Sequence, residues 1–113
     1  MKEFMLLFRA DYGKMQHYKP EDWQAATKKW KDWTDRLIAK GKWVAPGTQL
    51  SPNGKIVKSK GVVTDGPYAE LKESLLSYCI MRAESLEEAV ELSKDCPIFQ
   101  IDGSVEVRER IGS

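Results

Sequence analysis

Hydrophobic residues form runs of different period along this chain, and each period predicts a different element. Residues 4–8 and 75–83 are apolar at successive positions, which predicts two strands with apolar side chains on both faces. Strands of this kind need cover on both sides. Residues 105–111 alternate between apolar and charged side chains, as in a strand with one wet face. We therefore expect a sheet with two well-covered strands and one strand that faces water.

Residues 20–40 carry the period of an amphipathic helix. Pro20 suits its first turn and Gly41 suits the position just past its last turn, so both ends are marked. The apolar residues recur at spacings of three and four, and we expect this tryptophan-rich stripe to be buried against the sheet. In an alternative interpretation, Trp23 or Trp30 lies at the margin between helix and sheet and forms the wall of a cavity. The stripe consists of Trp23, Ala26, Trp30, Trp33 and Leu37.

Turn residues in the middle of the chain predict a hairpin. Residues 43–50 form its first strand, which Pro46 and Gly47 bend or bulge, and residues 55–60 return antiparallel to it. The sequence Ser-Pro-Asn-Gly at 51–54 joins the two strands, because Asn-Gly is favoured in tight hairpin turns. The lysines of the second strand, at 55–60, would discourage pairing of this hairpin with the edges of other sheets.

Two signals bound the elements of the second half. The sequence Asp-Gly-Pro at 65–67 predicts a turn before the strand at 75–83, because aspartate accepts backbone N–H groups, glycine tolerates positive φ and proline fixes φ. Ser85 and Glu88 have the spacing of a capping box, in which Glu88 bonds back to the backbone of Ser85. A helix is therefore predicted to begin there and to end at Pro97.

The predicted elements follow the order strand, long helix, hairpin, strand, helix, strand. This is the order of an α+β, ferredoxin-like fold with split βαβ units. Two helices cover one face of such a sheet and leave the other face in water. Residues 4–8 and 75–81 would then expose more apolar surface than monomers usually tolerate. We therefore expect a homodimer in which two sheets pack face to face about a two-fold axis.

Composition narrows the class of protein further. The chain has 113 residues, 42% hydrophobic and 31% charged, as expected for one folded domain spanning 1–113. The net charge is +1 with both signs interspersed, so we expect neither a nucleic acid nor a membrane partner. No apolar run approaches the ~20 residues of a membrane span, and the apolar segment at the start is too short for a signal peptide. We expect a cytoplasmic protein.

The reactive residue types give no sign of a cofactor. Cys79 and Cys96 lack the spacing of a metal or redox pair, and we expect both to be structural. The single histidine, His17, falls in a polar loop, where we expect it to be exposed to solvent. We therefore predict no metal and no cofactor.

One motif goes beyond these patterns. The sequence DGPYAELKE at 65–73 precedes an apolar strand, an acidic helix and a Cys-Pro stop at 96–97. This arrangement resembles the DGPF subgroup of the YCII-related family. The similarity extends to residues 5–8, 41–52 and 103–108, and so covers nearly the whole chain. It implies a dimeric α+β barrel, in agreement with the order of the elements.

The resemblance also implies a kind of chemistry. Characterised relatives in the wider family imply dehalogenation or isomerisation of ring-cleavage lactones, with a helix histidine paired to an aspartate. Counting back from Gly41, Trp30 stands at the position of that histidine, and a neutral indole cannot relay protons. The histidine–aspartate mechanism therefore does not transfer to this chain, where only His17 could replace the missing residue.

Asp65 is the remaining candidate for catalysis. Its carboxylate, presented at a turn, would act as a general base on a small organic acid or lactone held between the long helix and the sheet. The alternative is that Asp65 only forms the turn. Arg9 and Arg108 are candidate anion contacts, unless they pair with glutamates on the surface. The predicted ligand-binding residues are Arg9, Tyr12, Trp30 and Tyr68.

Two other functions stay open at this point. The resemblance associates DGPF proteins with sigma factors of the extracytoplasmic type, which would make this chain a non-catalytic binding or regulatory module. The near-neutral charge suits such a module better than it suits direct contact with DNA. The third alternative is a structural dimer that binds no ligand.

Overall fold

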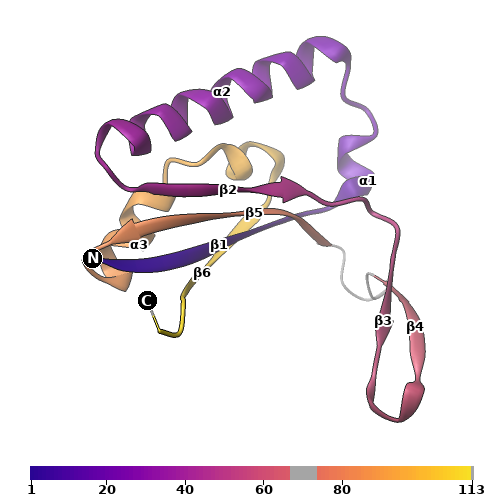
Figure 1. Ribbon diagram of the computed structural model, residues 1–113. Coiled ribbons are helices and arrows are strands. Elements are labelled where there is room, and N and C mark those ends of the chain that lie inside the picture. Colours follow the sequence, from indigo (N-terminus) through magenta and orange to yellow (C-terminus); the bar gives the residue numbers. More distant parts are fainter. Residues whose placement is uncertain (67–73, 113) are drawn as a thin grey trace.

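The structure, a computed structural model, describes residues 1–66 and 74–112 and, at 64–66, the backbone alone. Its main body is an antiparallel sheet with strand order β2-β5-β1-β6, and a two-stranded hairpin, β3-β4, projects from one end (Figure 1). The order of the elements in the main body is that of a ferredoxin-like fold, so the predicted α+β class is confirmed. The elements are β1 (Lys2–Ala10), α1 (Tyr12–Met15), α2 (Pro20–Ala39), β2 (Trp43–Gln49), β3 (Gly54–Val57), η1 (Ser59–Gly61), β4 (Val63–Gly66), β5 (Ser74–Ala83), α3 (Leu86–Ser93), η2 (Pro97–Ile101) and β6 (Ser104–Glu109).

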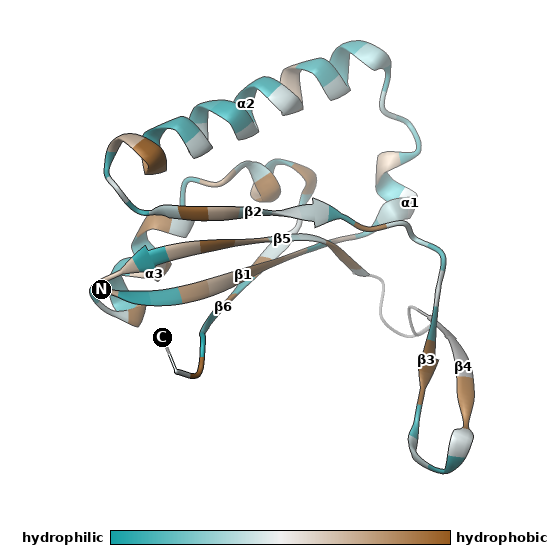
Figure 2. Ribbon diagram, viewed as in Figure 1, coloured by the Kyte–Doolittle hydropathy of each residue, from teal (hydrophilic) through white to brown (hydrophobic). Residues whose placement is uncertain are grey.

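β1 and β5 are the central strands of the sheet, and they place Leu6 opposite Cys79. Alternate residues of both strands, such as Phe4 and Leu6, are buried in the core that the helices cover. Met5 and Leu7 lie on the opposite face and stay partly exposed. Figure 2 shows hydrophobic residues along both strands. The two strands were predicted correctly, but a single copy of the chain covers only one of their faces.

α2 packs on the sheet at one end only. Trp33 and Leu37 in its C-terminal half are each 2% exposed, whereas Trp23 near its N-terminus is 44% exposed. The helix axis moves away from the sheet toward the N-terminus (Figure 1). The expectation that the whole tryptophan stripe is buried is therefore wrong at Trp23, because that half of the helix does not reach the sheet. The ends are as predicted, with Pro20 first and Gly41 following at φ 70°.

The predicted pairing of the middle strands is wrong. β2 pairs with the edge of β5, and β3 pairs with β4 in a separate sheet. The turn of that hairpin lies at Lys60 and Gly61, whose φ angles are 67° and 75°. β2 satisfies backbone groups along β5 that a local hairpin with β3 would have left without partners. The bend at Pro52 therefore leads the chain away from the main sheet.

The turn predicted at 65–67 is also wrong for its first two residues. Asp65 and Gly66 belong to β4, where their backbones pair with Lys55 and Gly54 of β3. The ladder with β3 keeps the chain extended through Gly66. Pro67 lies outside the described residues.

The capping box of α3 is confirmed at one of its two hydrogen bonds. The hydroxyl of Ser85 accepts a hydrogen bond from the Glu88 N–H at 3.1 Å. The Glu88 carboxylate accepts from the N–H of Glu84, one residue before the predicted donor, and from Lys42 Nζ at 2.7 Å.

Across residues 1–66 and 74–112, none of the helices has the length and apolar character needed to cross a membrane.

Candidate functional site

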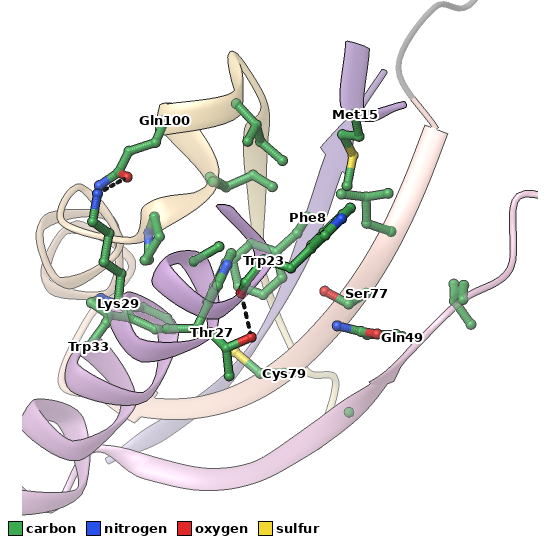
Figure 3. Close-up of a pocket in the computed structure, with 18 of the residues that line it drawn as sticks. Phe8, Met15, Trp23, Thr27, Lys29, Trp33, Gln49, Ser77, Cys79 and Gln100 are labelled. Carbon is green, nitrogen blue, oxygen red and sulfur yellow. Dashed lines mark hydrogen bonds between the residues drawn. The ribbon is translucent and has the colours of Figure 1, made fainter. Parts of the chain in front are cut away.

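A cleft of about 910 Å³ lies between the N-terminal half of α2 and the sheet, where the helix diverges from the strands. We call it the α2 cleft. α2 forms one wall, β1, β2 and β5 form the floor, and α1 and η2 add further residues (Figure 3). Its volume lies within the range of small-molecule sites.

All four tryptophans of the chain line the α2 cleft. Trp30 lies edge-on to Phe8 and to Trp33, with ring centroids 5.0 Å and 5.8 Å apart. Trp33 contacts Trp43 in the same way at 6.3 Å, and its indole N–H donates to the Leu92 carbonyl at 3.2 Å. Edge-to-face pairs stabilise a cluster beyond the area that they bury. The inner part of the cleft is therefore an ordered aromatic surface.

Tyr12 and Trp30, both predicted as ligand contacts, line this same cleft. The Tyr12 hydroxyl donates to the Leu50 carbonyl at 2.6 Å. Burial raises the pKa of Tyr12, so the phenol stays protonated at neutral pH. The Trp30 indole N–H has no acceptor among the described residues, which leaves a donor for a ligand. Contact of either side chain with a ligand stays a prediction.

The floor of the cleft carries neutral polar side chains. Gln49 on β2 lies opposite Ser77 on β5, and Cys79 follows two residues along. Figure 3 shows the Gln49 and Ser77 side chains next to each other. The β2 register is irregular between Pro46 and Gln49, in agreement with the bend or bulge predicted at Pro46 and Gly47. The sheet thus offers the cleft an amide and a hydroxyl side by side.

The charged side chains among the described lining residues are Asp22 and Lys29, both on α2. Asp22 accepts a hydrogen bond from the Lys19 N–H at 2.8 Å and so caps the helix. Lys29 Nζ donates to the Gln100 side chain at 2.7 Å and joins α2 to η2 (Figure 3). Both residues are exposed and belong to α2, which places these charges on the helix side of the cleft.

Two arginines named as anion contacts lie elsewhere. Arg9 Nη1 is 2.7 Å from Glu106 Oε1, and Arg108 Nη1 is 3.7 Å from Glu106 Oε2. Neither arginine is among the described residues that line the α2 cleft. The structure therefore favours the alternative in which both arginines pair with a surface glutamate.

The hairpin carries the candidate base. The Asp65 backbone pairs with Lys55, while the Asp65 side chain and the whole of Tyr68 lie outside the described part of the chain. Catalysis by Asp65 and ligand contact by Tyr68 both stay predictions. His17 is exposed in the turn that follows α1, as expected.

The cysteines have the character of core residues. Cys79 and Cys96 are both buried and free. Burial raises the pKa of Cys79 to about 12 and that of Cys96 to about 11, so both remain thiols at neutral pH. The described residues contain no cluster of three His, Cys, Asp or Glu side chains that could hold a metal ion.

Sequence reasoning missed the polar floor of the cleft. Ser77 had one visible signal, a small polar residue within the otherwise hydrophobic run at 75–80. Gln49 had no such signal, because it was assigned to a strand that was expected to pair with β3. Only the adjacency of β2 and β5 brings the two side chains together.

Fold and cleft together define the class: an α+β protein of ferredoxin-like topology with a ligand-sized aromatic cleft beneath its long helix. The YCII-related domain matches residues 3–111, from β1 to just beyond β6, and the chain belongs to the YCII-related family. No curated protein matches the chain. The family is therefore confirmed, while the DGPF subgroup and the association with sigma factors stay predictions.

Proposed function

We propose that this protein binds a small organic acid or lactone in the α2 cleft. One observation carries the proposal: about 910 Å³ of space is lined by all four tryptophans and has neutral polar groups on its floor. Small-molecule sites typically combine a concave, largely apolar and aromatic wall with a few placed polar groups.

The outer part of the cleft supports binding in a second way. Trp23 is 44% exposed and packs against Tyr18 at a centroid distance of 5.3 Å. Its apolar surface stays in contact with water until a ligand covers it. Covering ~100 Å² of such surface contributes roughly 2.5 kcal/mol, enough to favour a small ring compound.

The proposal places binding first and catalysis second. The indole N–H of Trp30 can donate a hydrogen bond but is not a base, so proton abstraction at this position is not supported. A general-base role for Asp65 is therefore a separate step of the proposal. If Asp65 acts on a bound lactone, Asp65→Asn abolishes turnover and leaves affinity unchanged. Full turnover by Asp65→Asn would leave Asp65 with a structural role only.

Tryptophan fluorescence and thermal shift test the binding step. Benzoate, phenylacetate, phthalide and coumarin serve as probes, and we expect at least one to quench the fluorescence and raise the melting temperature. Trp30→Leu should weaken that binding, whereas Phe99→Leu, at an exposed apolar residue outside the described lining, should not. No quenching and no thermal shift with any of the four probes would contradict the proposal.

We also propose that the protein is a homodimer of the DGPF subgroup. The Asp-Gly-Pro sequence at 65–67 supports the subgroup. The sheet face away from α2 supports the dimer, because it presents partly exposed apolar side chains in the middle of the sheet. These are Met5, Leu7 and Ile80, which we call the open face.

A further inference from the structure

Gln49 and Ser77 form a pair of neutral polar side chains on the floor of the α2 cleft. They lie opposite each other across β2 and β5, and Figure 3 shows them side by side among the lining residues. Neither side chain hydrogen-bonds another described residue. Gln49 is exposed and Ser77 is half-buried, so their donors and acceptors can bond water in the free chain and a bound molecule in its place.

Several other polar groups around the cleft already have partners. The hydroxyls of Thr27 and Tyr12 donate to backbone carbonyl groups at 2.8 Å and 2.6 Å. Asp22 caps α2, and Lys29 bonds the side chain of Gln100. The described floor of the cleft is thus both uncharged and able to form new hydrogen bonds.

We infer that Gln49 and Ser77 recognise the carbonyl oxygen of an uncharged, planar ring compound whose ring packs against Trp30. The inference rests on the proposed binding function and narrows its ligand from an acid or a lactone to the uncharged class. The Gln49 amide N–H and the Ser77 hydroxyl can both donate to one carbonyl oxygen. A carboxylate there would lose hydration without a cation among the described floor residues, which costs more free energy than burying a neutral carbonyl.

A pair of related compounds separates the two ligand classes. Phthalide is a neutral aromatic lactone, and 2-(hydroxymethyl)benzoate is the anion that forms when its ring opens. We expect the full-length chain to bind phthalide at least about tenfold more tightly at pH 7, by fluorescence titration. Equal or tighter binding of the anion would overturn the inference while leaving the binding function itself intact.

A third compound tests the role of the two side chains. Phthalan has the same ring system as phthalide but no carbonyl group. We expect the wild-type chain to prefer phthalide to phthalan, and the double variant Gln49→Leu/Ser77→Ala to lose that preference, because the donors to the carbonyl are gone. If the two side chains only supported the fold, the double variant would bind both compounds more weakly by the same factor, and the preference for phthalide would remain.

Gln24→Leu is the matched control, since Gln24 is exposed on α2 and is not among the described lining residues. It should keep the wild-type preference for phthalide. An unchanged preference in the double variant would assign carbonyl recognition to other residues and refute the inference. Failure of phthalide and phthalan to bind at all would refute it as well, and binding of the other probes would then decide the proposed function separately.

Discussion

At the residue scale, Gly47 shows how closely β2 and β5 approach beside the α2 cleft. A Cβ added at this position would overlap the carbonyl oxygen and the ring of Tyr78. We expect Gly47→Ala to lower the free energy of unfolding by roughly 1–3 kcal/mol, because the two strands must separate or the ring must move. Urea unfolding measures the loss.

Gly54→Ala is the control for Gly47→Ala, since a Cβ on Gly54 meets no heavy atom within 4 Å. We expect no loss of stability there. If both variants unfold at the same urea concentration as the wild type, the close approach of β2 to Tyr78 is not present in solution.

The two buried thiols make the folded chain less stable at alkaline pH. Burial raises the pKa of Cys79 from 9.0 to about 12 and that of Cys96 from 9.0 to about 11. Well below pH 9 both groups are protonated in the folded and the unfolded chain, so they add no pH dependence. Above pH 9 the unfolded chain releases protons that the folded chain retains. The free energy of unfolding therefore falls as the pH rises from 9 toward the folded-state pKa values.

A double variant isolates the contribution of the thiols. Between pH 8 and pH 10, each thiol should lower the free energy of unfolding by about 1 kcal/mol. The wild type should therefore lose about 2 kcal/mol more over this interval than Cys79→Ala/Cys96→Ala, in which the tyrosines and lysines still titrate. Urea unfolding at the two pH values measures both losses. Equal losses would mean that the folded chain ionises its cysteines as easily as the unfolded chain does.

Single residues of the site could be predicted only where a pattern marked them. Trp30 stood out because the helical period placed it in an aromatic stripe with Trp33. Arg9 was a candidate because its guanidinium suits anions, yet Glu106 on the neighbouring strand β6 pairs with it. Gln49 could not be found, because its position on the floor depends on which strand lies beside β2.

At the scale of elements, the N-terminus of α3 depends on one hydroxyl. Ser85 accepts the hydrogen bond from the Glu88 N–H at 3.1 Å, which satisfies one of the free donors of the first turn. Ser85→Ala should cost about 1 kcal/mol of stability, and Ser85→Asp should restore most of it because aspartate also caps helices. Thermal unfolding of the two variants measures both effects. Equal melting temperatures for the alanine and aspartate variants would exclude a capping role.

Strands were easier to predict than their partners. Periodicity and turn residues indicated extended chain at 43–50 and 55–60, and both segments contain strands. The predicted hairpin failed because local turn signals at 51–54 say nothing of a distant strand with an unpaired edge. β5 offered that edge to β2, and β3 then paired with β4 through the turn at Lys60 and Gly61.

At the scale of the whole molecule, the α2 cleft results from the tilt of one helix. The tilt could not be predicted from the sequence, although α2, its apolar stripe and a pocket between this helix and the sheet were all expected. The tilt depends on where Trp33 and Leu37 are buried, in the core cluster that also contains Phe4 and Leu6 of β1. The N-terminal half of α2 then extends beyond this contact, which exposes Trp23 and leaves room for a ligand.

The shape of the single chain supports pairing of two copies. Its principal extents are 42 × 40 × 19 Å, and its radius of gyration is 15.5 Å, against the ~13 Å expected for a compact chain of this length. The projecting β3-β4 hairpin accounts for part of this difference. One layer of helices over one sheet leaves the open face, with Met5 opposite Ile80, without cover. Two copies that pack by their open faces would bury these apolar side chains and form a thicker, more compact particle.

Sedimentation velocity at micromolar concentration tests the dimer directly. We expect the wild type to sediment as a dimer and Ile80→Asp to sediment as a monomer, because a carboxylate at the centre of the paired open faces would be buried without a partner. Ile38→Asp is the control, since Ile38 is 54% exposed on α2, and it should remain dimeric. If the wild type sediments as a folded monomer, the proposed dimer is refuted. The proposed ligand site is not, because the described walls and floor of the α2 cleft come from one chain.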